Sequence, residues 1–87
     1  MMNEGIGGQM IMAGAAGGKV SDIRYHSMVK YYRRQSGLRQ EDLAAKVDVS
    51  KRTIANAESD NCNVSLSTAL RLAAYFEKTV DELFVKE

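Results

Sequence analysis

The stretch QEDLAAKVDVSKRTIANAE, residues 40–58, decides the fold of this chain, because it predicts two short helices joined by a tight turn. Apolar side chains recur in its first half at the spacing that gives a short helix one buried stripe: Leu43, Ala44 and Val47. This spacing predicts a helix over residues 40–47. Asp48 is expected to end that helix, because aspartate tolerates the left-handed backbone conformation that a sharp chain reversal needs.

The second half of the stretch predicts a helix over residues 51–58, with Ser50 as its N-cap. Its inward side is expected to carry Val49, Ile54 and Ala57. Its outward side is basic and amide-bearing, and it carries Lys51, Arg52, Ala55, Asn56 and Ser59. An exposed helix of two to three turns has the dimensions to enter a DNA major groove, although the same pattern also suits two amphipathic helices in an ordinary bundle.

With its flanks, this run resembles the helix-turn-helix domain of the phage repressor, Cro and XRE family. The residues that match the family pattern in the run and before it are Arg33, Gly37, Leu38, Gln40, Leu43, Ala44, Val49, Ser50, Ile54 and Glu58. The match continues through Ser65, Leu66, Thr68, Leu70, Leu72 and Ala73, and ends at Val80, Asp81, Glu82, Leu83 and Phe84. The resemblance covers about residues 24–85 and implies an all-α, five-helix lambda-repressor-like domain.

The resemblance and the side-chain chemistry together predict which residues face DNA. The predicted set is Arg39, Gln40, Ser50, Lys51, Arg52, Thr53, Ala55, Asn56, Ser59 and Asn61. Lys51, Arg52 and Asn56 are expected at or near bases, because Lys or Arg can donate to guanine and Asn can pair with adenine. Thr53 suits a phosphate or a thymine methyl group, and Ala55 allows close approach to the groove.

The family also carries an arginine that pairs with the glutamate ending the recognition helix, which implies an Arg33–Glu58 ion pair in this chain. The pair is expected to be partly buried, and the alternative is an exposed pair of little energetic weight. In the family the residue matching Gln40 contacts a phosphate and braces the recognition helix, and the alternative is an ordinary exposed residue. Arg39 departs from the usual Ser, Thr or Asn cap, and Asp60 stands where Gly is common.

The remaining elements are expected on both sides of this core motif. Ser21 is predicted to cap a first helix that runs to about residue 36 and stops at Gly37. Its apolar stripe is expected to be Tyr25, Met28, Val29 and Tyr32, with His26 and Tyr31 exposed. A fourth helix begins at Ser65, and its inward side chains are predicted to be Leu66, Ala69, Leu70, Ala73 and Phe76. The pattern T-x-x-E from Thr79 to Glu82 predicts a last helix over residues 80–85.

Residues 1–20 carry six of the seven glycines and two charged residues, which predicts a flexible tail before a domain over residues 21–87. An apolar island within it, residues 10–13, suits docking on a surface groove or pairing between subunits. The charges of the domain are divided between its halves. Residues 24–52 hold eight Lys or Arg against three Asp or Glu, whereas residues 53–87 hold three against six. A basic half centred on the proposed reading helix suits phosphates.

The composition argues against several other classes of protein. One Cys and one His are too few for a zinc site, and no cofactor motif or catalytic set of residues is recognisable, so neither a cofactor nor an enzymatic activity is expected. Cys62 is expected to be an unreactive thiol, and a redox sensor is the alternative. Because the sequence also lacks a membrane-spanning run and a signal peptide pattern, the expected location is the cytoplasm.

The predicted function is sequence-specific binding of double-stranded DNA, with the second helix of the motif in the major groove. The protein would act as a transcriptional regulator, a repressor in the first instance, and would bind a two-fold operator as a homodimer. The alternative is a protein-interaction module of the same fold, for example an antitoxin that covers a toxin.

Overall fold

The computed structural model of the protein describes residues 18–87, so that nearly all of the predicted flexible tail, residues 1–20, lies outside the described part of the chain. The domain boundary at residue 21 therefore stays a prediction. The elements follow one another in the order β2 (Tyr25–Ser27), α1 (Val29–Gln35), α2 (Gln40–Val47), α3 (Lys51–Ala57), α4 (Leu66–Phe76), α5 (Val80–Leu83) and β3 (Phe84–Lys86). Five helices agree with the predicted number, and the small sheet corrects the prediction of an all-α fold.

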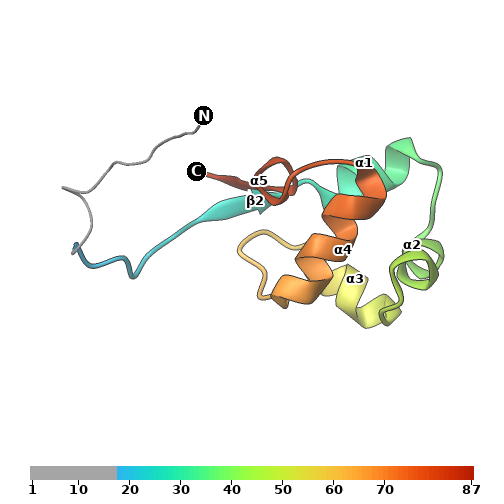
Figure 1. Ribbon diagram of the computed structural model, residues 1–87, viewed down its shortest axis with the longest axis horizontal. Helices are drawn as coiled ribbons and strands as arrows, with labels where there is room; N and C mark the ends of the chain where they lie inside the picture. Colours follow the sequence, from blue (N-terminus) through green and yellow to red (C-terminus); the bar gives the residue numbers. More distant parts are fainter. Residues whose placement is uncertain (1–17) are drawn as a thin grey trace, which may run out of the picture.

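The sheet consists of β2 and β3, which pair antiparallel with Tyr25 opposite Lys86 and Ser27 opposite Phe84. It lies at the end of the helical domain away from α2 (Figure 1). The predicted first helix from Ser21 is therefore wrong over its first two turns, because α1 begins only at Val29. The backbone of β2 finds its hydrogen-bond partners in β3, about sixty residues further along the chain, and local periodicity cannot show such a pairing. The last helix ends at Leu83 for the same reason.

Short polar side chains begin three of the helices, as the sequence predicts. Ser50, Ser65 and Thr79 each accept a hydrogen bond from the backbone N–H three residues further on, at the starts of α3, α4 and α5. At the other ends of α1 and α2 the chain turns through left-handed backbone conformations, with φ of +72° at Gly37 and +57° at Asp48. These turns make short connections, and across the turn at Asp48 the helices α2 and α3 pack against each other.

Asp48 provides a test of the turn between α2 and α3. Asp48→Val is expected to lower the free energy of unfolding by about 1–2 kcal/mol, because a β-branched side chain is disfavoured in a left-handed conformation. Asp48→Gly is the matched control, and its stability should stay within about 0.5 kcal/mol of the wild type, since the side chain is exposed. Urea unfolding followed by circular dichroism measures both. Equal stabilities of the two variants would contradict a strained turn at this position.

The core is formed by one set of apolar side chains from all five helices: Val29, Leu43, Ala44, Val47, Ile54, Ala57, Leu72, Ala73 and Leu83. The predicted inner side of α4 needs correction, since Leu66 and Leu70 are 71% and 53% exposed and Leu72 is fully buried. Two adjacent faces of α4 are apolar in sequence. The contacts of α4 with α2 and α5 select the face that carries Ala69, Leu72 and Ala73.

Candidate nucleic-acid interface

The α2–turn–α3 unit presents one side of α3 to solvent. Ile54 and Ala57 are fully buried on the inner side, where α3 packs against α2. The outer side is exposed as the sequence predicts, and it carries Lys51, Arg52, Ala55 and Asn56, followed by Ser59. In Figure 1, α3 lies at the edge of the domain, beside the start of α4. Its last residue, Ala57, accepts a hydrogen bond from the Ser27 hydroxyl of β2 at 2.5 Å. The exposed outer side of this two-turn helix is therefore accessible to a partner.

The start of α3 is electropositive. Within the described chain, the first turn of α3 carries no acidic side chain, whereas Lys51 and Arg52 both lie there and are exposed. The free backbone N–H groups at a helix start add a partial positive charge of their own. Arg39 and Lys46 on the neighbouring α2 region are exposed as well. Side chains and backbone therefore both favour an anionic partner at this end of α3.

Ser50 and Thr53 form the cap of α3. The Ser50 hydroxyl accepts from the backbone N–H of Thr53 at 3.0 Å, and the two side-chain hydroxyls lie 2.9 Å apart. Both residues are in the predicted DNA-facing set, and their positions at the helix start place them next to Lys51 and Arg52. Their first structural role is to fix where α3 begins, which sets the direction of its exposed side.

Asn56 has a structural contact that the sequence does not reveal. Its Nδ2 atom donates to the backbone carbonyl of Asn63 at 3.1 Å, which ties α3 to the loop before α4. Arg52, Asn56, Asn63 and Ser65 bound a shallow polar hollow beside α3. An amide that is held in this way keeps a defined orientation, so that its carbonyl and its second N–H can be offered to a partner with little loss of side-chain entropy.

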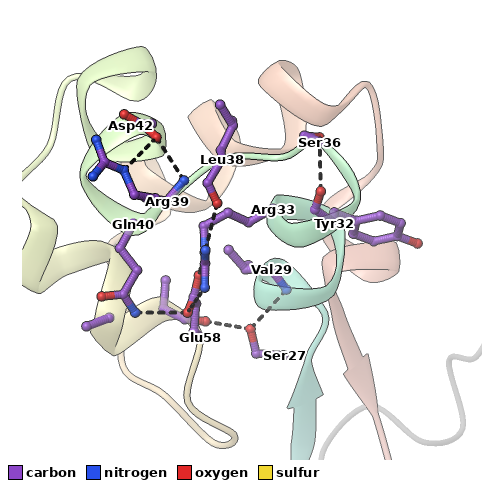
Figure 2. Close-up of polar contacts among 12 residues, drawn as sticks. Ser27, Val29, Tyr32, Arg33, Ser36, Leu38, Arg39, Gln40, Asp42 and Glu58 are labelled. Atoms are coloured by element: carbon purple, nitrogen blue, oxygen red, sulfur yellow. Dashed lines mark hydrogen bonds and ion pairs between the residues drawn. The ribbon is translucent and has the colours of Figure 1, made fainter.

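A buried ion pair fixes the other end of α3. Figure 2 shows the Arg33 guanidinium of α1 between Glu58 and the backbone carbonyl of Leu38. Its Nε pairs with one Glu58 oxygen, its Nη2 lies 3.3 Å from the other, and its Nη1 donates to Leu38 at 2.8 Å. The side chains of Arg33 and Glu58 are only 10% and 5% exposed. The structure thus contains the partly buried pair rather than the exposed alternative.

Gln40 joins the same network. Its Nε2 donates to Glu58 Oε1 at 3.0 Å, so that the first residue of α2 holds the residue that follows α3 (Figure 2). This contact supports the bracing role that the resemblance implied, and it engages the Gln40 amide nitrogen rather than its side-chain carbonyl oxygen. Arg39 just before it is exposed, with its backbone N–H bound by the Asp42 carboxylate at 2.9 Å. That hydrogen bond is the main reason why the pKa of Asp42 is lowered.

The loop after α3 is held by β2 through contacts that the sequence reasoning missed. Asp60 accepts from the backbone N–H of Ser27 at 3.0 Å and faces His26 Nδ1 at 3.2 Å. These contacts lower the pKa of Asp60, the backbone hydrogen bond most strongly. The Asn61 side-chain carbonyl accepts from the backbone N–H of Tyr25 at 2.8 Å. The partners are more than thirty residues apart in sequence, so no local signal could have indicated them.

These contacts change the interpretation of two loop residues. The carboxylate of Asp60, which stands where Gly is common in the family, is turned toward β2. Asn61, predicted to face DNA, uses its side-chain carbonyl to hold β2 and adopts a left-handed conformation with φ of +54°. His26 is exposed as expected, but its second ring nitrogen also lies 3.1 Å from a Glu87 carboxylate oxygen. The His26 ring therefore lies between Asp60 of the loop and Glu87.

Cys62 lies behind this loop and is 8% exposed. Its burial raises the pKa of the thiol, so the thiol is protonated at neutral pH. Reactive and redox-sensing cysteines have lowered pKa values and are accessible, and therefore the environment of Cys62 favours the unreactive thiol over the sensor. Among residues 18–87 no group of His, Cys, Asp and Glu is arranged to hold a metal ion. In the same range, no helix is long and apolar enough to cross a membrane.

The fold and the α2–turn–α3 geometry define a helix-turn-helix protein, and residues 29–83 match the helix-turn-helix family model. The chain belongs to this Cro/C1-type, or XRE, family of helix-turn-helix regulators. An uncharacterized HTH-type transcriptional regulator of Methanocaldococcus jannaschii is 39% identical over 59 residues, which are 68% of this chain and 89% of the relative. A second uncharacterized HTH-type transcriptional regulator, of Archaeoglobus fulgidus, is 35% identical over 57 residues, or 66% of this chain and 81% of the relative.

Proposed function

We propose that this protein binds double-stranded DNA with α3 in the major groove and thereby regulates transcription in the cytoplasm, as a repressor. The observation that carries the proposal is the exposed, electropositive start of α3. The Ser50 cap fixes the start of this helix, and the Arg33–Glu58 pair fixes its end. A major groove admits a helix of these dimensions, and a rigidly held helix keeps its side chains in register with the bases. A repressor of this size would act by occupying its site.

Within this proposal the residues divide into two groups. Lys51, Arg52 and Asn56 are the candidates for base contacts, since their donors and acceptors match guanine and adenine edges. Contacts with the phosphates and the groove wall are proposed for Arg39, Gln40, Ser50, Thr53, Ala55, Ser59 and Asn61. Gln40 and Asn61 would contribute chiefly by backbone position, because their side chains are engaged within the protein. Such contacts set orientation and carry no sequence information by themselves.

We further propose that two copies bind a two-fold operator, with their α3 helices about 34 Å apart, one turn of the DNA helix. One helix of two turns reaches too few base pairs for strong specificity. Two copies double the number of base contacts and give the operator its symmetry. No additional cofactor is part of this proposal.

Arg52→Ala tests the DNA proposal directly. Its affinity for a selected operator is expected to fall about 10- to 100-fold, the loss typical of one specific base contact of roughly 1–3 kcal/mol. Fluorescence anisotropy would measure the affinity for an operator selected from random duplexes. Measurements at about 50 and 200 mM salt would show the steep decrease that phosphate contacts cause. Loss of preference for one base pair would assign Arg52 to a base rather than a phosphate.

Lys78→Ala is the matched control, because it also removes one cation. Lys78 lies beyond the end of α4, over the Tyr32 ring of α1, whereas α3 lies near the start of α4 (Figure 1). Its affinity for the operator should stay near that of the wild type. Equal losses of affinity in both variants would mean that the binding depends on general charge attraction rather than on a specific contact of Arg52. If no duplex binds even at low salt, the DNA proposal fails, and a protein-interaction module such as an antitoxin becomes the better reading of the fold.

A further inference from the structure

An apolar groove lies between β2, the start of α4, α5 and β3. Its apolar lining includes Ile23, Tyr25, Leu66, Val80 and Phe84. Leu66 is 71% and Ile23 56% exposed, which are high values for large aliphatic side chains. Contiguous apolar surface of this kind is uncommon on soluble monomers and marks contact sites. We call this surface the β2–α4 groove.

The edge of β2 beside this groove is only partly occupied. The loop after α3 covers it at Tyr25, whose backbone N–H donates to the Asn61 side chain and whose C=O accepts from the Asn61 N–H. Alternate residues of an extended strand direct their backbone groups to the same edge, so Ile23 presents its N–H and C=O there too. Among the described residues, no backbone hydrogen bond joins residues 19–23 to another residue. The edge is therefore open just before the loop covers it.

The sequence before β2 contains a segment that fits this open edge. The pair Gly17–Gly18 is typical of a two-residue turn between antiparallel strands, and the chain bends at the second of the two glycines. Such a turn places Ala16 opposite Lys19 and, four residues further along each strand, Met12 opposite Ile23. Opposed residues of an antiparallel pair lie on the same face, so Met12 joins Ile23 on the side of the groove.

The chemistry of the segment also matches the groove. Residues 10–13 are the apolar island Met-Ile-Met-Ala, and residues 5–18 carry no charge. The charged residues that border the groove, Asp81 and Lys86, are both exposed, so an apolar occupant leaves them in contact with water. Methionine fills irregular apolar surface well, because its side chain is unbranched and flexible. Since segment and groove belong to one chain, the effective concentration of the segment is on the order of millimolar.

We propose that residues 10–13 dock in the β2–α4 groove of their own chain. Met12 then lies beside Ile23 and Leu66. The returning segment adds a short antiparallel strand to the open edge of β2 and stops where the loop after α3 covers that edge. It shields the exposed Leu66 side chain and closes the groove to other partners. This inference goes beyond the proposed function and does not rest on it, and its test needs no DNA.

Oxidation of methionine in the full chain tests the proposal. Dilute hydrogen peroxide oxidises methionines according to their exposure, and mass spectrometry of peptides gives the rate at each position. Met12 is expected to react about threefold or more slowly than Met2, which lies outside the proposed contact. Leu66→Glu should bring the two rates together, because it places a charge in the apolar groove. Tyr75→Glu is the matched control and should keep Met12 protected, since Tyr75 is an exposed residue of α4 that borders a different hollow.

Backbone amide resonances give a second measurement that does not depend on chemical reactivity. Met12→Asp should shift the amide resonances of Ile23, Leu66 and Phe84, because it removes the apolar side chain that packs on the groove. Met2→Asp adds the same charge to the same segment and should leave these resonances unchanged. Both substitutions lie outside residues 18–87, so neither removes a contact of the described domain.

Equal oxidation rates of Met12 and Met2 in the wild type would overturn the proposal, and so would protection of Met12 that Leu66→Glu leaves intact. Protection that disappears on dilution would also overturn it, because the segment would then occupy the groove of another copy. Unchanged amide resonances in Met12→Asp would contradict the contact with Ile23 directly.

Discussion

Glu58→Ala is expected to lower the free energy of unfolding by about 3–5 kcal/mol, because it leaves the Arg33 guanidinium buried without its counter-charge. The Arg33 side chain is only 10% exposed, and the Leu38 carbonyl alone would then face it. Small domains are stable by about 5–15 kcal/mol in total, so this single change removes a large part of the stability. Urea unfolding followed by circular dichroism gives the value.

Two controls define the origin of this loss. The double variant Arg33→Met, Glu58→Met should lose much less than the sum of the single variants, because it removes both charges from the interior. Arg39→Ala breaks the Arg39–Asp42 pair, whose side chains are 77% and 39% exposed, and should cost less than about 1 kcal/mol. A Glu58→Ala variant no less stable than Arg39→Ala would show that burial does not strengthen the Arg33–Glu58 pair.

The loss also has a functional consequence. Glu58 follows directly on α3 and is bound by side chains from both α1 and α2. Without it, α3 keeps its Ser50 cap but loses the ion pair with Arg33 and the hydrogen bond from Gln40 at its other end. Under the proposed function, the folded fraction of Glu58→Ala should therefore bind its operator more weakly, although Glu58 itself is buried away from the exposed side of α3.

Leu72→Ala is expected to cost about 2–5 kcal/mol, because Leu72 is fully buried and its truncation leaves a cavity in the core. Leu70→Ala is the comparison on the same helix with the same residue types. Leu70 is 53% exposed, so the free energy of unfolding of Leu70→Ala should lie within about 0.5 kcal/mol of the wild-type value. Both variants should be measured at the same low protein concentration, since any association would add apparent stability.

The reversed order, with Leu70→Ala the more damaging change, would mean that α4 is rotated from the orientation described above. It would restore the assignment that the sequence pattern favours, in which Leu66 and Leu70 point inward. This pair of variants therefore tests which face of α4 enters the core.

The sequence by itself determined the helix-turn-helix. The bounds of α2, the turn at Asp48 and the caps at Ser50, Ser65 and Thr79 are as predicted. Each depends on hydrogen bonds and steric limits within about four residues, and the local sequence is enough to predict such interactions. The exposed basic side of α3 was predictable for a similar reason, because helical periodicity separates it from Ile54 and Ala57.

The Arg33–Glu58 pair came from the resemblance rather than from any local pattern. Its partners are 25 residues apart, and the sequence alone left open whether the pair is buried or exposed. The structure decided this question by enclosing both side chains between α1, α2 and the end of α3. Burial of a charge depends on which elements surround it, which is a property of the assembled fold.

Only the tertiary structure decided the pairing of β2 with β3, the rotation of α4 and the attachment of the loop at Asp60 to Ser27. Each joins a segment to a partner far along the chain, or chooses between two apolar faces that are equally good locally. Whether a helix cap forms depends only on residues close to it in sequence. Whether two distant strands pair, or which face of a helix enters the core, depends on all the other ways in which the chain could pack. The burial and hydrogen bonding of the whole domain therefore decide which of these arrangements forms.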